Sequence, residues 1–389
     1  MTKQLTKYAL TLGLTLWSLS ALCTPGINMP IGVTPVSHEI YQLHMTIFWI
    51  CVTIGIGVFS VMFYAIINHR KSKGARPADF HENIWIEIIW TIIPILILIA
   101  MAIPASKVLM HMDDTADADV NIKITGYQWK WRYDYLDEGF GFFSNLSTPY
   151  KQLHNEEPKG KWYLLEVDHP LVVPVHAKIR FLVTANDVIH SWWVPELGVK
   201  QDGIPGFIQD TWTRIDTPGI YRGQCAELCG MNHGFMPIVV KAVTKNEYKQ
   251  WIKNRTGRDA ASNTEMARIR GNLNKPMSHT ELMHEGESGY LKHCALCHQG
   301  LGQGMPPAFP AIAGSAIATG PLDGHVSIVL NGKPGTAMQA FSEQLNNREL
   351  AAIITYQRNA WGNGNIIKAK NFATEIQPKA IAAVKEAQQ

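Results

Sequence analysis

Soft metal-binding side chains are concentrated in one short stretch of the sequence, Cys225-Ala-Glu-Leu-Cys229-Gly-Met-Asn-His233-Gly-Phe-Met236, and His190 lies upstream of it. Such groups suit copper, and a blue copper site uses one cysteine, two histidines and a weak axial methionine. This stretch adds a second cysteine, so two thiolates could bridge two copper ions. The cysteine pair alone would equally suit a structural disulfide or a thiol pair for copper delivery. His190, His233 and Met236 favour the two-copper site.

A second cluster, Cys294-Ala-Leu-Cys297-His298, has the spacing at which two cysteines bond to a c-type heme and the adjacent histidine binds its iron. The alternative is a chance match or a redox dithiol, and the helical pattern around the cluster favours heme. A methionine as sixth ligand raises the potential of a cytochrome c. Met305 follows His298 too closely to pass around the heme edge. We therefore expect Met338 to be the sixth ligand.

The composition favours a membrane protein that carries redox cofactors. The chain has 389 residues, of which 17% are charged, and 12 tryptophans, which is consistent with membrane association and more than one domain. A net charge of +3 is too small to indicate a nucleic-acid-binding protein. The last four of the 6 cysteines form two close pairs, each followed by a histidine, which favours cofactor binding over a disulfide framework.

Residues 1–23 have the features of a signal peptide. Lys3 and Lys7 supply a basic start, a short apolar core follows, and a small-x-small pattern marks a cleavage site. Cys23 raises the alternative of a lipoprotein, but the bulky Leu22 before it argues against lipidation. Export would place the mature N-terminus outside the cytoplasm.

A transmembrane hairpin is expected in residues 24–111, with helices at about 43–68 and 84–107. Both segments contain uncharged apolar runs that can cross a hydrocarbon layer of about 30 Å. The connecting loop is rich in lysine and arginine, and such loops remain in the cytoplasm. The chain after the hairpin must then lie on the outer face of the membrane.

Residues 112–254 are expected to form a β-sandwich. Short β-rich runs at 120–125, 162–167, 178–184 and 238–243 are separated by proline and glycine. His190 follows one run and the Cys225 stretch lies between later runs, an order that suits a cupredoxin. A capping box at Thr244–Glu247 predicts a short helix, and the polar residues 255–276 are expected to be a linker.

An all-α domain is expected over residues 277–365. Capping boxes at Ser278–Glu281 and Asn346–Glu349 predict helix starts on either side of the heme motif, and the domain resembles a small class I cytochrome c. Residues 366–389 are expected to be a mobile tail. The predicted fold class is therefore multi-domain: a two-helix transmembrane hairpin, a cupredoxin-like β-sandwich and an all-α class I cytochrome c domain.

Residues 30–245 resemble subunit II of cytochrome c oxidase, and the stretch that starts at Cys225 is similar to the loop that holds its dinuclear copper centre, CuA. The resemblance implies the side-chain copper ligands His190, Cys225, Cys229, His233 and Met236. It also implies that Glu227 gives its backbone carbonyl to one copper and its carboxylate to a magnesium ion at the interface with the catalytic subunit. From the residues alone, Glu227 could equally be a solvated loop residue.

The aromatic run Gln-Trp129-Lys130-Trp-Arg132-Tyr alternates with period two and predicts a strand with one buried face. In the family, a similar run holds the tryptophan that accepts electrons from cytochrome c, and Trp129 occupies that position. Lys130 and Arg132 beside it would repel a basic donor. The sequence also departs from the family at Phe207, where an arginine often contacts the catalytic subunit.

Glu87 lies at the cytoplasmic edge of the second expected membrane helix. A carboxylate in a membrane segment is a functional hypothesis because burying its charge there is costly. The resemblance places a proton-uptake glutamate at this position. The alternative is a boundary residue that reaches to the membrane surface.

These features together imply a caa-like subunit II with a fused cytochrome c. Such a chain receives electrons at heme c from an external cytochrome c or another donor, passes them to CuA and hands them to heme in subunit I. Its expected location is a bacterial inner membrane, with subunit I and subunit III as partners. A quinol oxidase subunit would lack both cysteine motifs, and a copper-delivery protein would not need a heme. A nitrous oxide reductase would lack the membrane hairpin.

Overall fold

The computed structural model describes residues 28–76, 82–256 and 273–387. The expected signal peptide at residues 1–23, including Cys23, lies outside the described residues, as does most of the expected linker at 255–276.

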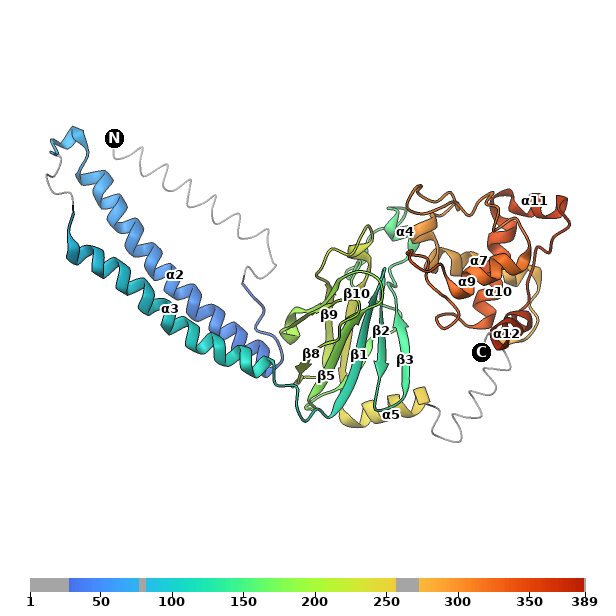
Figure 1. Cartoon of the computed structure of the whole chain (residues 1–389), viewed down its shortest axis with the longest axis horizontal. Helices are drawn as coiled ribbons and strands as arrows, with labels where there is room; N and C mark the ends of the chain where they lie inside the picture. The colour runs from blue at the N-terminus through green and yellow to red at the C-terminus, as the bar shows by residue number, and fades with distance from the viewer. Residues whose placement is uncertain (1–27, 77–81, 257–272, 388–389) are drawn as a thin grey trace. The chain divides into compact units, whose positions relative to one another are not determined.

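Two long helices form the first part of the described chain (Figure 1): α2 spans Pro35–Asn68 and α3 spans Ile84–Met112. Both are long and apolar enough to cross a membrane, and each contains an 18-residue stretch of high mean hydropathy, 2.4 in α2 and 2.6 in α3. α2 begins before the expected residue 43, at Pro35, whose fixed backbone angle suits the first turn of a helix. α3 continues through Pro94, as membrane helices commonly do.

Two five-stranded sheets form the next domain, in the strand orders β3-β2-β1-β5-β8 and β4-β10-β9-β6-β7. Apolar side chains from both sheets build one shared core, as expected of a sandwich. The strands are β1 Val120–Tyr127, β2 Lys130–Tyr135, β3 Phe140–Ser144, β4 Leu171–Pro174, β5 Ile179–Ala185, β6 His190–Val194, β7 Val199–Gly203, β8 Gln209–Thr213, β9 Gly219–Cys225 and β10 Pro237–Val243.

The strand pairing brings distant residues to one end of the sandwich. β6 and β9 are antiparallel, with Trp192 opposite Cys225, so the start of β6 and the end of β9 meet. β1 runs parallel to β5, and β5 ends just before β6 begins. The β1–β2 turn with Trp129, the start of β6 with His190, and Cys225 therefore lie at the same end.

One expected strand is absent. Residues 162–167 form turns, with only an isolated bridge between Val167 and Leu146. Leu164 has φ of 61°, in the left-handed region that an extended strand cannot use. This irregular segment follows the short helix α4, Tyr150–Leu153, and Trp162 in it is 41% exposed.

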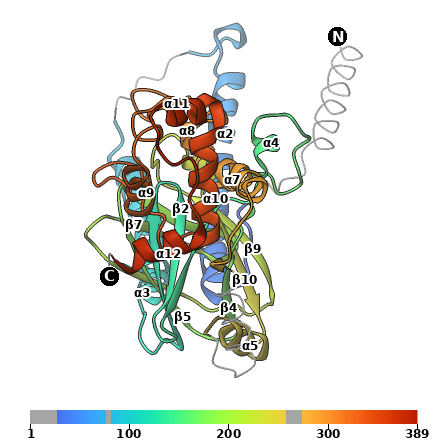
Figure 2. The ribbon, with the colours of Figure 1, turned by 90° about the vertical axis from the view of Figure 1, so that its right-hand side faces the viewer.

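The C-terminal domain is helical (Figure 2): α7 His279–His293, α8 Ala295–His298, α9 Leu322–Asn331, α10 Asn347–Asn359, α11 Asn363–Ala369 and α12 Pro378–Glu386. Both predicted capping boxes are present. α7 and α10 pack closely at Gly286, where an added Cβ would lie 2.2 Å from the carbonyl oxygen of Ala352. Glycine at this position therefore allows the two helices to approach.

Two expected boundaries change. Residues 366–389 are not simply a tail, because α12 lies there and buries Pro378 and Ile381 against the domain core. The helix expected after Thr244 extends further, since α5 spans Lys245–Thr256 and includes the first residues of the expected linker. The overall order of hairpin, sandwich and helical domain is as predicted.

Candidate metal centre and heme pocket

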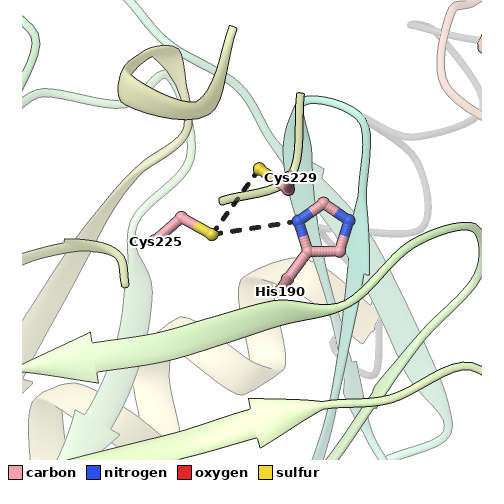
Figure 3. A group of neighbouring side chains, drawn as sticks. All are labelled: His190, Cys225 and Cys229. Atoms are coloured by element: carbon pink, nitrogen blue, oxygen red, sulfur yellow. Dashed lines mark hydrogen bonds between the residues drawn. The ribbon is translucent and has the colours of Figure 1, made fainter. Parts of the chain in front are cut away.

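Three soft donors converge at the end of β9. The Sγ of Cys225 lies 3.8 Å from the Sγ of Cys229 and 3.9 Å from the Nδ1 of His190 (Figure 3). These three ligand atoms lie within 4.8 Å of one another, and all three residues are buried. Both cysteines are free thiols, so the structure favours a metal site over the structural disulfide.

The rest of the loop adds further donors around Cys229. The Nδ1 of His233 and the Sδ of Met236 each lie 3.5 Å from its Sγ. The Cys225 sulfur lies 3.3 Å from the backbone carbonyl oxygen of Glu227, and the Glu227 side chain is exposed. All five predicted side chains and the predicted carbonyl are therefore brought together.

The orientation of His190 is set by Asp187, a residue that the sequence analysis missed. The Asp187 carboxylate lies 2.8 Å from the Nε2 of His190, which leaves Nδ1 facing the Cys225 sulfur. The other carboxylate oxygen accepts a hydrogen bond from the backbone of Gln128 at 2.8 Å. Burial alone would lower the pKa of His190, but the hydrogen bond to Asp187 raises it. An acid three residues before a candidate ligand was the available signal.

The two thiols of the loop share one proton. A hydrogen bond from Cys229 stabilises the Cys225 thiolate and lowers the pKa of Cys225 to about 4, while the same interaction raises the pKa of Cys229. Cys225 is therefore ionised at neutral pH. Two sulfurs, two imidazoles and a thioether at this spacing are donors that soft metal ions prefer, so the residues fit a copper centre.

The β1–β2 turn holds the metal loop through hydrogen bonds to its backbone. The indole Nε1 of Trp129 and the amide of Gln128 donate to the carbonyl of Cys229 at 3.1 and 2.8 Å. The indole of Trp131 donates to the carbonyl of Met236 at 3.2 Å. Trp129 is thus directly bonded to the backbone of one candidate ligand.

A cavity of about 1100 Å³ lies beside the second cysteine cluster and is lined by Cys294, Cys297, His298 and Met338. The Nδ1 of His298 lies 2.8 Å from the carbonyl oxygen of Pro310. A carbonyl only accepts, so Nδ1 carries the proton and Nε2 keeps a free lone pair, as an iron-binding histidine requires. The residues therefore fit a covalently attached heme.

The lining of the cavity distinguishes between the two methionines considered as the sixth heme ligand. Met338 lines it, whereas the backbone of Met305 pairs with Phe309 in an isolated bridge. Burial raises the pKa of the Cys294 thiol to about 12 and that of Cys297 to about 11. Both are therefore neutral thiols at physiological pH, unlike Cys225.

Glu87 lies in the first turn of α3 and is partly exposed. Its carboxylate accepts a hydrogen bond from the backbone of Asn83 at 3.4 Å, which suits the N-terminus of a helix. This contact is compatible with both the proton-uptake and the boundary interpretation. Phe207, the departure from the family pattern, has 65% of its surface exposed, which leaves it available to another subunit.

Comparison with protein-family models gives three matches. The models described as "Cytochrome C oxidase subunit II, transmembrane domain" and "Cytochrome C oxidase subunit II, periplasmic domain" match residues 23–108 and 120–243. The model "Cytochrome C oxidase, cbb3-type, subunit III" matches residues 281–356. The matches follow the hairpin, the sandwich and the helical domain in turn.

Curated relatives agree with the family models. A probable cytochrome c oxidase subunit 2 of Rickettsia bellii is 37% identical over 265 residues, which cover 67% of this chain and 96% of that protein. Cytochrome c oxidase subunit 2 of Cereibacter sphaeroides is 38% identical over 245 residues, 60% of this chain and 81% of that protein. The crystal structure of the periplasmic domain of subunit II from Bradyrhizobium japonicum matches with 40% identity and a TM-score of 0.33, covering 38% of this chain and 99% of that one.

Proposed function

The chain belongs to the cytochrome c oxidase subunit II family, and from this we propose that it carries electrons to the catalytic subunit through a heme c and a CuA centre of its own. It accepts the electrons from an external cytochrome c or another donor and delivers them to heme in subunit I. Oxygen reduction and the coupled proton translocation take place in the oxidase complex that this chain forms with subunit I. The observation that carries the proposal is the presence, in one chain, of a converging Cys–His–Met site and a Cys-x-x-Cys-His cavity.

Membership in the family establishes the coarse properties of the molecule. It is a membrane protein with a periplasmic domain, and it works with subunit I of a heme–copper oxidase. The subunit II domain implies copper and the cytochrome domain implies heme c. When bound, these groups supply reversible one-electron transfer.

We assign the copper ligands to the five side chains His190, Cys225, Cys229, His233 and Met236 and to the Glu227 carbonyl. The support is their convergence within hydrogen-bonding distances and their burial: Cys225, Cys229 and Met236 are 6%, 2% and 1% exposed. A dry and rigid set of ligands keeps water away from the metal and changes little in position during electron transfer. The Asp187 carboxylate orients His190, as residues behind metal ligands generally do.

For the heme, we assign Cys294 and Cys297 as the attachment points, His298 as the first axial ligand and Met338 as the second. The support is that all four line one cavity and that the Pro310 carbonyl fixes the His298 tautomer. The neutral thiols of the two cysteines suit addition across the heme vinyl groups. The methionine would raise the potential of the heme.

Trp129 is proposed as the residue through which electrons reach the copper centre, because its indole is bonded to the Cys229 carbonyl. The exposed Glu227 carboxylate is proposed to bind magnesium at the contact with subunit I, and Glu87 to serve proton uptake. These roles rest on family resemblance together with the exposure of Glu227 and the position of Glu87 in the first turn of α3.

The domain assignment is proposed as a hairpin at 24–111, a sandwich at 112–254 and a heme domain that starts at 277 and includes α12. A basic cytoplasmic loop around η1, Lys71–Lys73, orients the hairpin in a bacterial inner membrane. Subunit III is proposed as a second membrane partner.

The test is metal and optical analysis of the intact complex purified from membranes. We expect two copper ions for each covalently bound heme c, together with the absorption of a mixed-valence copper pair. Heme c without copper, or copper without covalent heme, would reject the proposed path of electrons.

A further inference from the structure

The loop that carries Met338 is fastened at both ends. It spans residues 332–346, between the end of α9 and the start of α10. The backbone amide of Lys333 donates to the carbonyl oxygen of Met338 at 2.8 Å. On the limb that returns to α10, the amides of Phe341 and Ser342 donate to carbonyl oxygens in the last turn of α9, at 3.1 and 3.2 Å. The loop is therefore closed on itself and attached to α9.

Lys385 in α12 holds the same return limb through its side chain. The ammonium donates to the carbonyl oxygens of Ser342 at 2.6 Å and Leu345 at 3.2 Å. Hydrogen bonds from a charged donor are stronger than those between neutral groups. Burial lowers the pKa of Lys385, while the Glu349 carboxylate acts in the opposite direction. One half-buried side chain therefore bridges two backbone groups of the limb that follows Met338.

α12 is anchored to the heme domain by contacts that do not involve Lys385. Ile381 is fully buried in the apolar cluster that also contains side chains of α10. Just before the helix, the Gln377 side chain exchanges two hydrogen bonds with the backbone of Met277, at 2.9 and 3.1 Å. The family-model match to this domain covers residues 281–356, so α12 lies beyond it. α12 is thus a fixed support from which Lys385 reaches the loop.

We propose that Lys385 is a positioning residue for the proposed sixth heme ligand, Met338. By fixing the return limb, it keeps the Met338 side chain in the wall of the heme cavity, which Met338 lines. A thioether is a weak ligand, so its occupancy of the iron depends on how often the sulfur is near the metal. A short segment fixed at both ends keeps that effective concentration high. The inference rests on the proposed function, because it takes Met338 as the ligand.

Competition with imidazole tests this inference in the purified full-length protein with its heme attached. In the oxidised protein, imidazole can bind the iron only after Met338 has left it, and the near-infrared absorption band of methionine-ligated ferric heme then disappears. Lys385→Met removes the charge and preserves the length of the side chain. We expect it to lower the imidazole concentration at half loss of the band by about tenfold, the order expected when a hydrogen bond from a charged group is lost.

Lys379→Met is the matched control, because Lys379 lies in the first turn of the same helix and is exposed. This variant should require the same imidazole concentration as the wild type. An equal response of the two variants would overturn the inference, since the effect would then follow from the loss of any charge on α12.

Hydrogen exchange, measured by mass spectrometry, separates positioning from a general loss of stability. In Lys385→Met we expect faster exchange of the loop amides, including those of Gln344 and Leu345, which donate to the Phe341 carbonyl oxygen in the wild type. Exchange in α7 should stay unchanged. Equally faster exchange in α7 and in the loop would assign Lys385 a general role in folding and reject the positioning role.

The wild-type spectrum separates this inference from the proposed function. If the wild type shows no methionine band, Met338 is not the ligand and the proposed heme assignment fails. If the wild type shows the band and Lys385→Met resists imidazole equally well, the assignment of Met338 stands and only the role of Lys385 is rejected.

Discussion

The indole Nε1 of Trp129 donates a hydrogen bond to the carbonyl oxygen of Cys229 at 3.1 Å. The residue proposed to accept electrons is thus hydrogen-bonded directly to the backbone of a proposed copper ligand. Phe309 approaches the same indole from the heme domain. Trp129 therefore contacts both the backbone of the proposed copper loop and a residue that lines the heme cavity.

Replacing Trp129 by phenylalanine keeps the aromatic packing and removes the hydrogen bond. We expect Trp129→Phe to lower stability by about 1 kcal/mol and to slow electron transfer from heme c to copper, while the copper content stays unchanged. Flash reduction of the purified complex measures the rate. Trp162→Phe, at a tryptophan with 41% of its surface exposed, is the matched control, and an equal slowing in both variants would contradict a specific role for Trp129.

Cys229→Ser tests whether two thiolates are needed for two coppers. Serine oxygen is a poor ligand for soft metals, so we expect the sandwich to fold and the two-copper centre to be lost. Elemental analysis and the optical spectrum measure this. Two coppers with an unchanged spectrum would remove Cys229 from the ligand set.

Asp187→Asn removes the charge behind His190 and preserves the shape of the side chain. Since residues behind a metal ligand typically change affinity by about tenfold or more, we expect copper to be lost at a correspondingly lower chelator concentration. The control is Asp210→Asn. The Asp210 carboxylate pairs with Arg180, and both residues lie in the sheet that does not contain His190. Equal chelator resistance of wild type and Asp187→Asn would assign Asp187 a purely structural role.

Met338→Ala and Met305→Ala form a pair that identifies the sixth heme ligand. Both variants should retain covalent heme, because the attachment motif is intact. We expect only Met338→Ala to lower the midpoint potential of heme c, since loss of a methionine ligand removes its stabilisation of the reduced iron. A redox titration in which Met305→Ala carries the larger shift would reverse the assignment.

Glu87→Gln tests proton uptake. The amide keeps the contact with the Asn83 backbone but cannot carry a proton. We expect oxygen consumption by the assembled oxidase to slow while the copper and heme c spectra stay as in the wild type. Normal turnover would leave Glu87 as a boundary residue of α3.

The sequence alone indicated the proposed ligands but not the residues that hold them in place. Cys225, Cys229, His233 and Met236 are close in the chain, so their side-chain chemistry and spacing indicate a metal site directly. Asp187 was missed because an acid near a histidine is common in any sequence. Only the contact of its carboxylate with the Nε2 of His190 shows that it lies behind a proposed ligand.

The positions and ends of some helices and strands were predicted less well than the proposed ligands. The apolar residues at 162–167 suggested a strand, but their backbone includes a left-handed residue, Leu164. α12 was missed although Pro378 and the spacing of Ile381 and Val384 are typical of an amphipathic helix. Its burial depends on packing against α10, which a local pattern does not reveal.

The guanidinium of Arg132 in the sandwich lies 3.0 Å from the carboxylate of Glu343 in the helical domain. Both residues lie in the same polypeptide, and this affects how their contact can change during evolution. Where donor and acceptor are separate proteins, exchanging the two charges requires matched substitutions in two genes. Here both substitutions fall in one gene and are inherited together. The two charges can therefore be exchanged without a matching substitution in another protein. Each chain has one heme domain for one sandwich. The proposed transfer of electrons from heme c to the copper centre therefore does not depend on how much soluble donor a cell produces.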